Sequence, residues 1–155
     1  MPGFKDDILK VARGLGIPTG QFDAVSIHAW PPIMKRIEAS FIMKTDSNTR
    51  FNWWWESFKG KRVSIFFENG RAFEQLSQLI EADEVVWFIG CDTARDPSKY
   101  WLFQGAVKAI QQVIGEFYAF EYYVVSKKYD WLLSVTDHDE LIGLGSMTAR
   151  MERLN

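Results

Sequence analysis

Residues 84–90, EVVWFIG, decide the predicted fold. This stretch is almost entirely apolar, and it is too short for a buried helix to be favoured. It is therefore predicted to be a central strand that is covered on both faces. The preceding segment 62–67, RVSIFF, is rich in β-branched and aromatic residues and predicts a second strand. Between the two, residues 70–82, GRAFEQLSQLIEA, predict an amphipathic helix.

The chain after this central stretch predicts a long helix and then a hairpin. Apolar residues recur at alternating spacings of four and three from Phe103 to Phe117, which predicts one helix over residues 98–117. Residues 120–126 and 131–137 have the composition of strands. Only four residues separate them, a length that suits a β-hairpin.

The C-terminal residues complete the predicted order of elements. Residues 140–145, ELIGLG, predict a further strand or a turn, and residues 146–154 predict a closing helix with Ser146 as its N-cap. From residue 62 the order is therefore strand, helix, strand, helix, strand, strand, helix. The first three strands are expected to be parallel neighbours joined by right-handed crossovers, and the hairpin adds an antiparallel strand. This order matches a thioredoxin-like topology, but the sequence has no C-x-x-C motif.

The expected fold is a single α/β (α+β) domain over residues 1–155, with a mixed sheet of four to five strands flanked by helices. Residues 1–60 are expected to form a mainly helical region that packs on an α/β core of residues 61–155. Residues 4–13 carry an apolar stripe, and the two prolines at 31 and 32 predict the start of another helix. The segment AVSIHAW before them is ambiguous between strand and loop.

Composition and charge exclude several classes of partner. The chain has 155 residues and a net charge of −2, so no strong attraction to nucleic acid or to an anionic membrane is expected. Cys91 is the single cysteine, and it cannot form an internal disulfide. The N-terminus lacks the apolar stretch of a signal peptide, and no run of apolar residues is long enough to cross a membrane. These features predict a cytoplasmic protein.

The segment RFNWWWESFKGKR, residues 50–62, holds three consecutive tryptophans. On a helix, Trp54 and Trp55 share one apolar face and Trp53 does not. A strand separates the indoles differently, but it also leaves one of them near the surface. An exposed Trp53 flanked by the basic residues Arg50, Lys59, Lys61 and Arg62 is a candidate anchor for a protein partner. The alternative is that a neighbouring element covers it.

Two polar segments are candidate ligand sites. CDTARD follows the predicted central strand, and ligands of open α/β sheets bind beyond the carboxyl ends of strands, so Cys91, Asp92 and Arg95 are candidates. TDHDE, residues 136–140, offers Asp137 and His138 for acid–base or ligand chemistry. The alternatives are an ordinary strand-to-helix loop and a solvated turn. The sequence has no zinc, P-loop or esterase motif, and no cofactor or metal site is predicted.

The segments RFNWWWESFKG and EYYVVSKKYDWLLSVTDHDELIGLG resemble an uncharacterised family of small bacterial cytosolic proteins. In that family a WWW/WWE segment precedes a Y-x-V-S-x-K-[YF]-x-W-L stretch that ends in a His-Asp pair. The resemblance covers about the last two thirds of the chain, and it implies a bacterial origin and no established activity. Small proteins of this type often neutralise secreted toxins as immunity proteins. Thr136 departs from the Asn-His-His-like pattern expected before the polar pair, which puts a polar site there in doubt.

Three functions are consistent with these observations. The first is a non-enzymatic bacterial cytosolic binding protein, of the immunity type that binds and neutralises a protein toxin. The second is a small-molecule-binding or hydrolytic domain that uses the loops at 91–98 and 136–140. The third is a homo-oligomeric adaptor with the tryptophan run as its self-interface.

Overall fold

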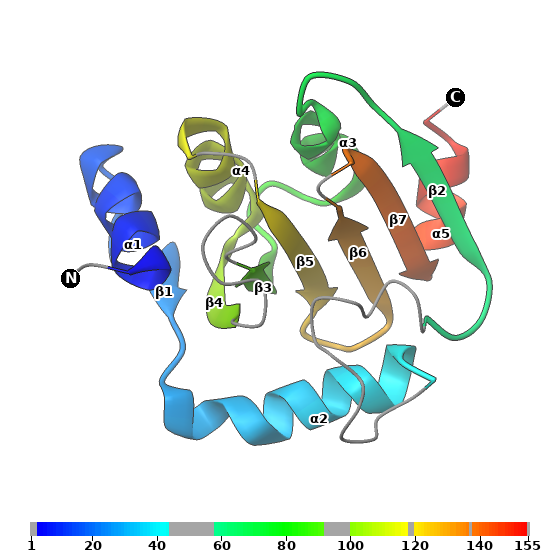
Figure 1. The fold of residues 1–155 in the computed structure, drawn as a ribbon, viewed down its shortest axis with the longest axis horizontal. Helices are drawn as coiled ribbons and strands as arrows, with labels where there is room; N and C mark the ends of the chain where they lie inside the picture. Colours follow the sequence, from blue (N-terminus) through cyan, green and yellow to red (C-terminus); the bar gives the residue numbers. More distant parts are fainter. Residues whose placement is uncertain (1–2, 44–57, 92–99, 118–119, 137, 155) are drawn as a thin grey trace.

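The computed structural model describes residues 3–43, 58–91, 100–117, 120–136 and 138–154. Within these residues, seven strands form one antiparallel sheet in the order β1-β4-β3-β5-β6-β7-β2, and helices pack on both of its faces (Figure 1). The predicted combination of helices and a sheet is confirmed. The predicted mixed sheet of four to five strands is wrong.

The strands are β1 (Phe22–Ala24), β2 (Arg62–Phe66), β3 (Val85–Cys91), β4 (Tyr100–Ala106), β5 (Glu121–Ser126), β6 (Trp131–Val135) and β7 (Glu140–Gly145). The helices are α1 (Phe4–Gly14), α2 (Trp30–Phe41), α3 (Leu76–Leu79), α4 (Val107–Glu116) and α5 (Met147–Glu152), with the short 3-10 helices η1 (Ile27–Ala29) and η3 (Ala72–Gln75).

The apolar stretch at 84–90 forms a central strand, as predicted. β3 pairs with β4 on one side and with β5 on the other. Its side chains alternate between two apolar layers, because successive residues of a strand point to opposite faces. Phe88 is fully buried in one layer and Ile89 is fully buried in the other.

The predicted helix over residues 98–117 is wrong in its first part. Residues 100–106 form β4, and helix α4 begins at Val107. The regular apolar spacing arose because Phe103, on the strand, faces the same apolar layer as the buried side of α4. β4 pairs with both β3 and β1, and these two ladders satisfy its backbone on both edges.

The presence of β4 also corrects the predicted topology. β3 and β4 are antiparallel neighbours and therefore need no crossover helix between them. The parallel arrangement expected for the first three strands, and with it the thioredoxin-like topology, does not occur. β1 and β7 add two further strands. β7 resolves the open choice at residues 140–145, and β1 brings the N-terminal region into the sheet.

Two predicted helices also differ in detail. The amphipathic helix expected over 70–82 is only η3 followed by the single turn of α3, because the extended backbone of Ile80 turns the chain back towards β3. Ser146 does precede α5, but its side chain makes no capping hydrogen bond.

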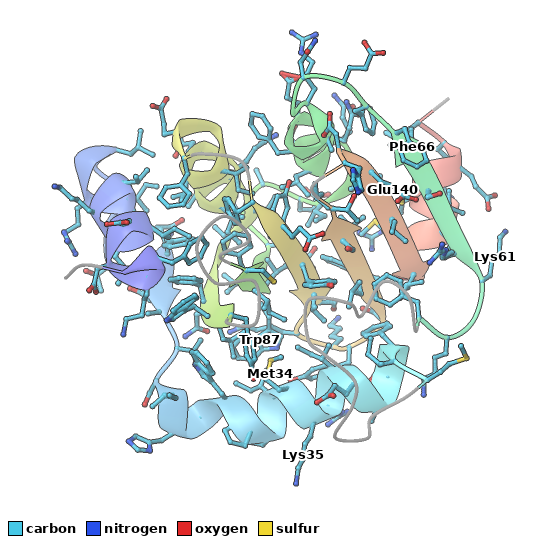
Figure 2. The ribbon with its side chains drawn as sticks, in the orientation of Figure 1. Met34, Lys35, Lys61, Phe66, Trp87 and Glu140 are labelled. Carbon is cyan, nitrogen blue, oxygen red and sulfur yellow. The ribbon has the colours of Figure 1, made fainter. Side chains whose placement is uncertain are left out.

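Two apolar layers lie on opposite faces of the sheet. The first, under α1, α3, α4 and α5, is rich in aromatic rings, and Phe4 of α1 stacks on Trp101 there with the ring centroids 5.3 Å apart. The second layer lies under α2, which runs across the strands (Figure 1). Figure 2 shows Met34 on the sheet side of α2 and Lys35 pointing away from it, and this matches their buried and exposed states.

Candidate functional site

Cys91 and the start of the 136–140 turn lie at the same end of the central strands. Cys91, the last residue of β3, lies opposite Glu121, and the next residue of β5, Tyr122, lies opposite Val135 at the end of β6. Two strand spacings, about 10 Å, therefore separate the end of β3 from the start of the 136–140 turn. Three of the predicted site residues, Asp92, Arg95 and Asp137, lie outside the described residues.

Cys91 is a core residue in this arrangement. Its side chain is fully buried in the layer under α2. Burial raises the pKa of its thiol well above the usual value, and the nearby Glu121 carboxylate raises it further. Because the thiolate is the reactive form of cysteine, a thiol that stays protonated at neutral pH is a poor nucleophile.

Hydrogen bonds within the 136–140 turn fix its conformation. The backbone N–H of Asp139 donates to the Thr136 carbonyl (3.1 Å), and the backbone N–H of Thr136 donates to the Glu140 carbonyl (3.0 Å). The Thr136 hydroxyl accepts hydrogen bonds from the backbone N–H groups of His138 (3.3 Å) and Glu140 (3.4 Å). The His138 side chain is exposed, whereas Asp139 is half-buried. The polar run therefore holds the β6–β7 connection in shape.

Asp139 joins this turn to a second turn that is distant in the sequence. Its carboxylate accepts the backbone N–H of Arg71 at one oxygen (3.1 Å) and that of Ala72 at the other (3.0 Å). It thus satisfies donors at the start of η3 that have no partner inside the helix. Asp139 itself has a φ of 60°, a left-handed conformation that Asp tolerates better than most residues.

The second turn has its own local cause in the sequence. Asn69 and Gly70 have φ angles of 59° and 69°, and the N–H of Arg71 donates to the Glu68 carbonyl (3.3 Å). Positive φ at both central residues is typical of a type I′ turn, for which Asn-Gly is the preferred pair. The two turns then lie side by side, because Phe67 donates its N–H to the Asp139 carbonyl (2.9 Å).

A cavity of about 400 Å³ lies between these turns and the C-terminal end of α4. We call it the strand-end cavity. Four aromatic rings line it, those of Phe73, Phe117, Phe120 and Tyr122. Its polar lining residues are Asn69, Thr136 and Asp139, and the rest of the wall comes from Gly70, Ile114, Gly115 and Val135.

The Tyr122 hydroxyl is the unusual group of this cavity. The side chain is 3% exposed, and the hydroxyl has no hydrogen-bond partner among the described residues. Burial raises the pKa of the Tyr122 phenol, and the Asp139 carboxylate raises it further. The phenol therefore stays neutral, and it can both donate and accept a hydrogen bond. A buried polar group without a partner is rare enough in folded proteins to require an explanation.

The predicted tryptophan-run site is described only at Lys59, Lys61 and Arg62. Trp53 and Arg50 are outside the described residues. The Lys59 ammonium donates to the Ala39 carbonyl at the end of α2, and Arg62 begins β2 opposite Leu144. The strand-end cavity adjoins the other end of β7, so Lys59 and Arg62 are not brought together with it.

The sequence reasoning missed Tyr122 and its neighbours because their patterns had ordinary explanations. The sequence pattern places Phe73 and Phe117 on apolar helix faces and Tyr122 within a predicted strand. The Asn-Gly pair at 69–70 was the available local signal, since it predicts a tight turn. The contact of Asp139 with Ala72 spans 67 residues and leaves no local signal.

The described residues offer neither a cluster of metal ligands nor a membrane-spanning helix. In the described part of the chain, no three His, Cys, Asp or Glu side chains lie close enough to share a metal ion. No helix of that part is both long and apolar enough to cross a membrane.

Comparison with known proteins gives a family but no activity. No curated protein and no solved structure matches the chain. A model described as "Family of unknown function" matches residues 1–155, which is more of the chain than the resemblance noted for residues 50–60 and 121–145. The match agrees with the expectation of a family without an established activity, while the tryptophan motif and the immunity type stay predictions. The chain belongs to this family, DUF6756.

Proposed function

We propose that this protein binds a small organic molecule in the strand-end cavity. The observation that carries the proposal is the Tyr122 hydroxyl, which is buried, neutral and without a partner among the described residues. A ligand that hydrogen-bonds to this hydroxyl would remove the cost of leaving it unsatisfied. This is the small-molecule alternative from the sequence, centred on the 136–140 turn.

The size and lining of the cavity support this proposal. Ligand pockets usually measure about 300–1,000 Å³ and combine apolar walls with a few polar groups. The strand-end cavity, at about 400 Å³, has aromatic walls with Tyr122 and Asp139 among its polar groups. Several elements position these groups, and the two turns are tied together through Asp139.

The chemistry of the polar groups supports binding more than catalysis. A neutral phenol with a raised pKa is a weak general base. Both Asp139 oxygens already accept backbone N–H groups, which fixes the carboxylate in place. The Cys91 thiol is buried on the opposite face of the sheet and takes no part.

A fragment screen by NMR on the intact protein tests the proposal. Ligands of the cavity should shift the amide signals of Gly70 and Gly115, which line it. Tyr122→Phe should lower the affinity for these ligands by about two- to tenfold, since one neutral hydrogen bond is lost. Tyr123→Phe is the matched control, because its ring lies in the opposite apolar layer.

The control variant should leave the affinity unchanged. If no fragment shifts Gly70 or Gly115, or if both variants bind equally well, the cavity is not the ligand site and the proposal fails.

A protein partner of the immunity type is the second candidate, and the exposed edge of the sheet favours it. β2 is the last strand in the sheet, and among the described residues no strand pairs with its outer edge. Phe66 on β2 is 67% exposed and lies opposite Glu140 of β7 (Figure 2). An open edge with an exposed ring can accept an extended segment of another protein.

Affinity capture with matched variants tests this second candidate. A toxin-like partner retained by the wild-type protein should be lost with Phe66→Ser and kept with Lys35→Ser, because Lys35 points away from the sheet on α2 (Figure 2). Equal recovery with both variants would contradict a role for this edge.

A further inference from the structure

The aromatic rings of the strand-end cavity form a cage, and this inference rests on the proposed ligand function of that cavity. The Phe117 and Phe120 rings lie edge to face, with centroids 5.5 Å apart and an interplanar angle of 88°. The Phe120 and Tyr122 rings follow at 5.4 Å and 51°. Neighbouring rings in the cavity wall are therefore inclined to one another, and aromatic rings that surround a cavity are a known binding site for organic cations.

The charge of the lining has a single sign. Asp139 contributes a carboxylate, and no Lys or Arg is among the described lining residues. Arg71, which follows the lining residue Gly70, has its guanidinium 3.6 Å from the Glu74 carboxylate, and both side chains are exposed. A carboxylate has about four acceptor positions, so two backbone N–H groups do not exhaust Asp139.

We infer that the ligand of this cavity is an organic ammonium cation, held against the aromatic rings and facing the Asp139 carboxylate. The Tyr122 hydroxyl accepts an N–H of the ammonium group or donates to an oxygen elsewhere in the ligand. An anionic ligand is disfavoured, because no cation of the described lining would compensate its charge beside Asp139. A neutral ligand of the same shape gains the apolar contacts but neither the cation–π nor the ionic contribution.

Two probes of the same shape, one charged and one neutral, show how much the charge of a ligand contributes to its affinity for the wild-type protein. Choline carries a quaternary ammonium group, and 3,3-dimethylbutan-1-ol is its neutral carbon isostere. Titration calorimetry, with the amide signals of Gly70 and Gly115 read by NMR, should show choline binding about tenfold more tightly than the isostere.

Asp139→Asn keeps the size and shape of the side chain and removes its charge. It should reduce the advantage of choline over the isostere several-fold, whereas Glu140→Gln, the same charge change on the next residue, should not. Phe120→Leu is a second variant, which removes a ring and leaves the residues of the two turns unchanged. It should lower the affinity for choline more than the affinity for the isostere.

The outcomes separate this inference from the proposed function. If the isostere or another neutral fragment binds as tightly as choline at Gly70 and Gly115, the cavity binds ligands but the ammonium class is wrong. If choline, the isostere and the fragment library all leave these two signals unmoved, the inference and the proposed function both fail. If Asp139→Asn and Glu140→Gln change the affinity for choline equally, the Asp139 carboxylate does not face the ammonium group and that part of the inference is overturned.

Discussion

Tyr122 and Tyr123 are consecutive residues of β5, both are buried, and they face opposite sides of the same sheet. The Tyr123 ring packs in the layer under α2, edge to face with Phe58 at 6.4 Å. The Tyr122 ring packs in the other layer, beside Phe120, and lines the strand-end cavity, and its buried hydroxyl has no partner among the described residues. The comparison teaches that strand position and burial do not separate a tyrosine that only packs in the core from one that lines a cavity. The difference lies in what each face of the sheet packs against.

The same contrast extends along β3. Phe88 contacts the rings of Phe22, Phe103, Phe120 and Tyr122, with centroid distances between 5.7 and 6.2 Å. Its neighbour Ile89 lies in the layer under α2, where the ring of Tyr123 packs against Phe58. The aromatic layer therefore runs without interruption from the middle of the sheet to the cavity wall, and its packing should control the shape of the cavity.

The largest expected effect is the loss of Phe88. Phe88→Ala should lower the free energy of unfolding by about 3–5 kcal/mol, because it removes a fully buried ring and leaves a cavity. Urea unfolding followed by circular dichroism measures this. Ile89→Val, a smaller truncation on the other face, should cost about 0.5–1.5 kcal/mol. A cost below about 1 kcal/mol for Phe88→Ala would break the comparison of the two layers.

The next effect concerns the link between the two turns. Asp139→Ala should lower the free energy of unfolding by about 1–3 kcal/mol, because the N–H of Ala72 loses its acceptor and the N–H of Arg71 keeps only its longer hydrogen bond to the Glu68 carbonyl. Hydrogen exchange should show faster exchange at these two amides, while the amides of β3 stay protected. Unchanged exchange at Arg71 and Ala72 would mean that the carboxylate does not hold η3 to the turn.

A gain in stability is expected from Tyr122→Phe. Removing an unsatisfied buried hydroxyl should raise the free energy of unfolding of the ligand-free protein by about 1 kcal/mol. Tyr123→Phe should bring no such gain, since its side chain does not line the cavity. Thermal and urea unfolding of both variants give the comparison directly. A loss of stability in Tyr122→Phe would show that its hydroxyl is satisfied in the folded protein.

The smallest effect is a pH dependence that arises on the α2 face. The folded-state pKa of Cys91 is raised above its unfolded value of about 8.5, so its contribution to stability is complete below that pH. As the pH rises past it, the unfolded thiol loses its proton while the folded thiol keeps it, and stability falls by about 0.8 kcal/mol at pH 9. Unfolding of wild-type and Cys91→Ala proteins at pH 7, 8 and 9 measures the difference. Parallel losses in both proteins would assign the pH dependence to other groups.

Much of the fold could be predicted from local patterns. The apolar stretch at 84–90, the hairpin around residues 127–130 and the helix opened by Pro31 and Pro32 are all present. Each of these rests on interactions between residues that are close in the sequence, or on a run so apolar that it must be buried. The segment at 100–106 could not be assigned in this way, because its apolar spacing fits a helix and a strand equally well.

The sequence alone determined that this chain would bury strands and helices in an aromatic-rich core, because the composition and spacing of its residues require that burial. Only the tertiary structure decided the antiparallel order of the sheet and placed Tyr122 and Asp139 around one cavity. Pairing between β strands and contacts between distant turns depend on which surfaces meet in space. These long-range contacts do not appear as any periodicity along the chain. The candidate site is made of them, so the sequence pattern could not predict it.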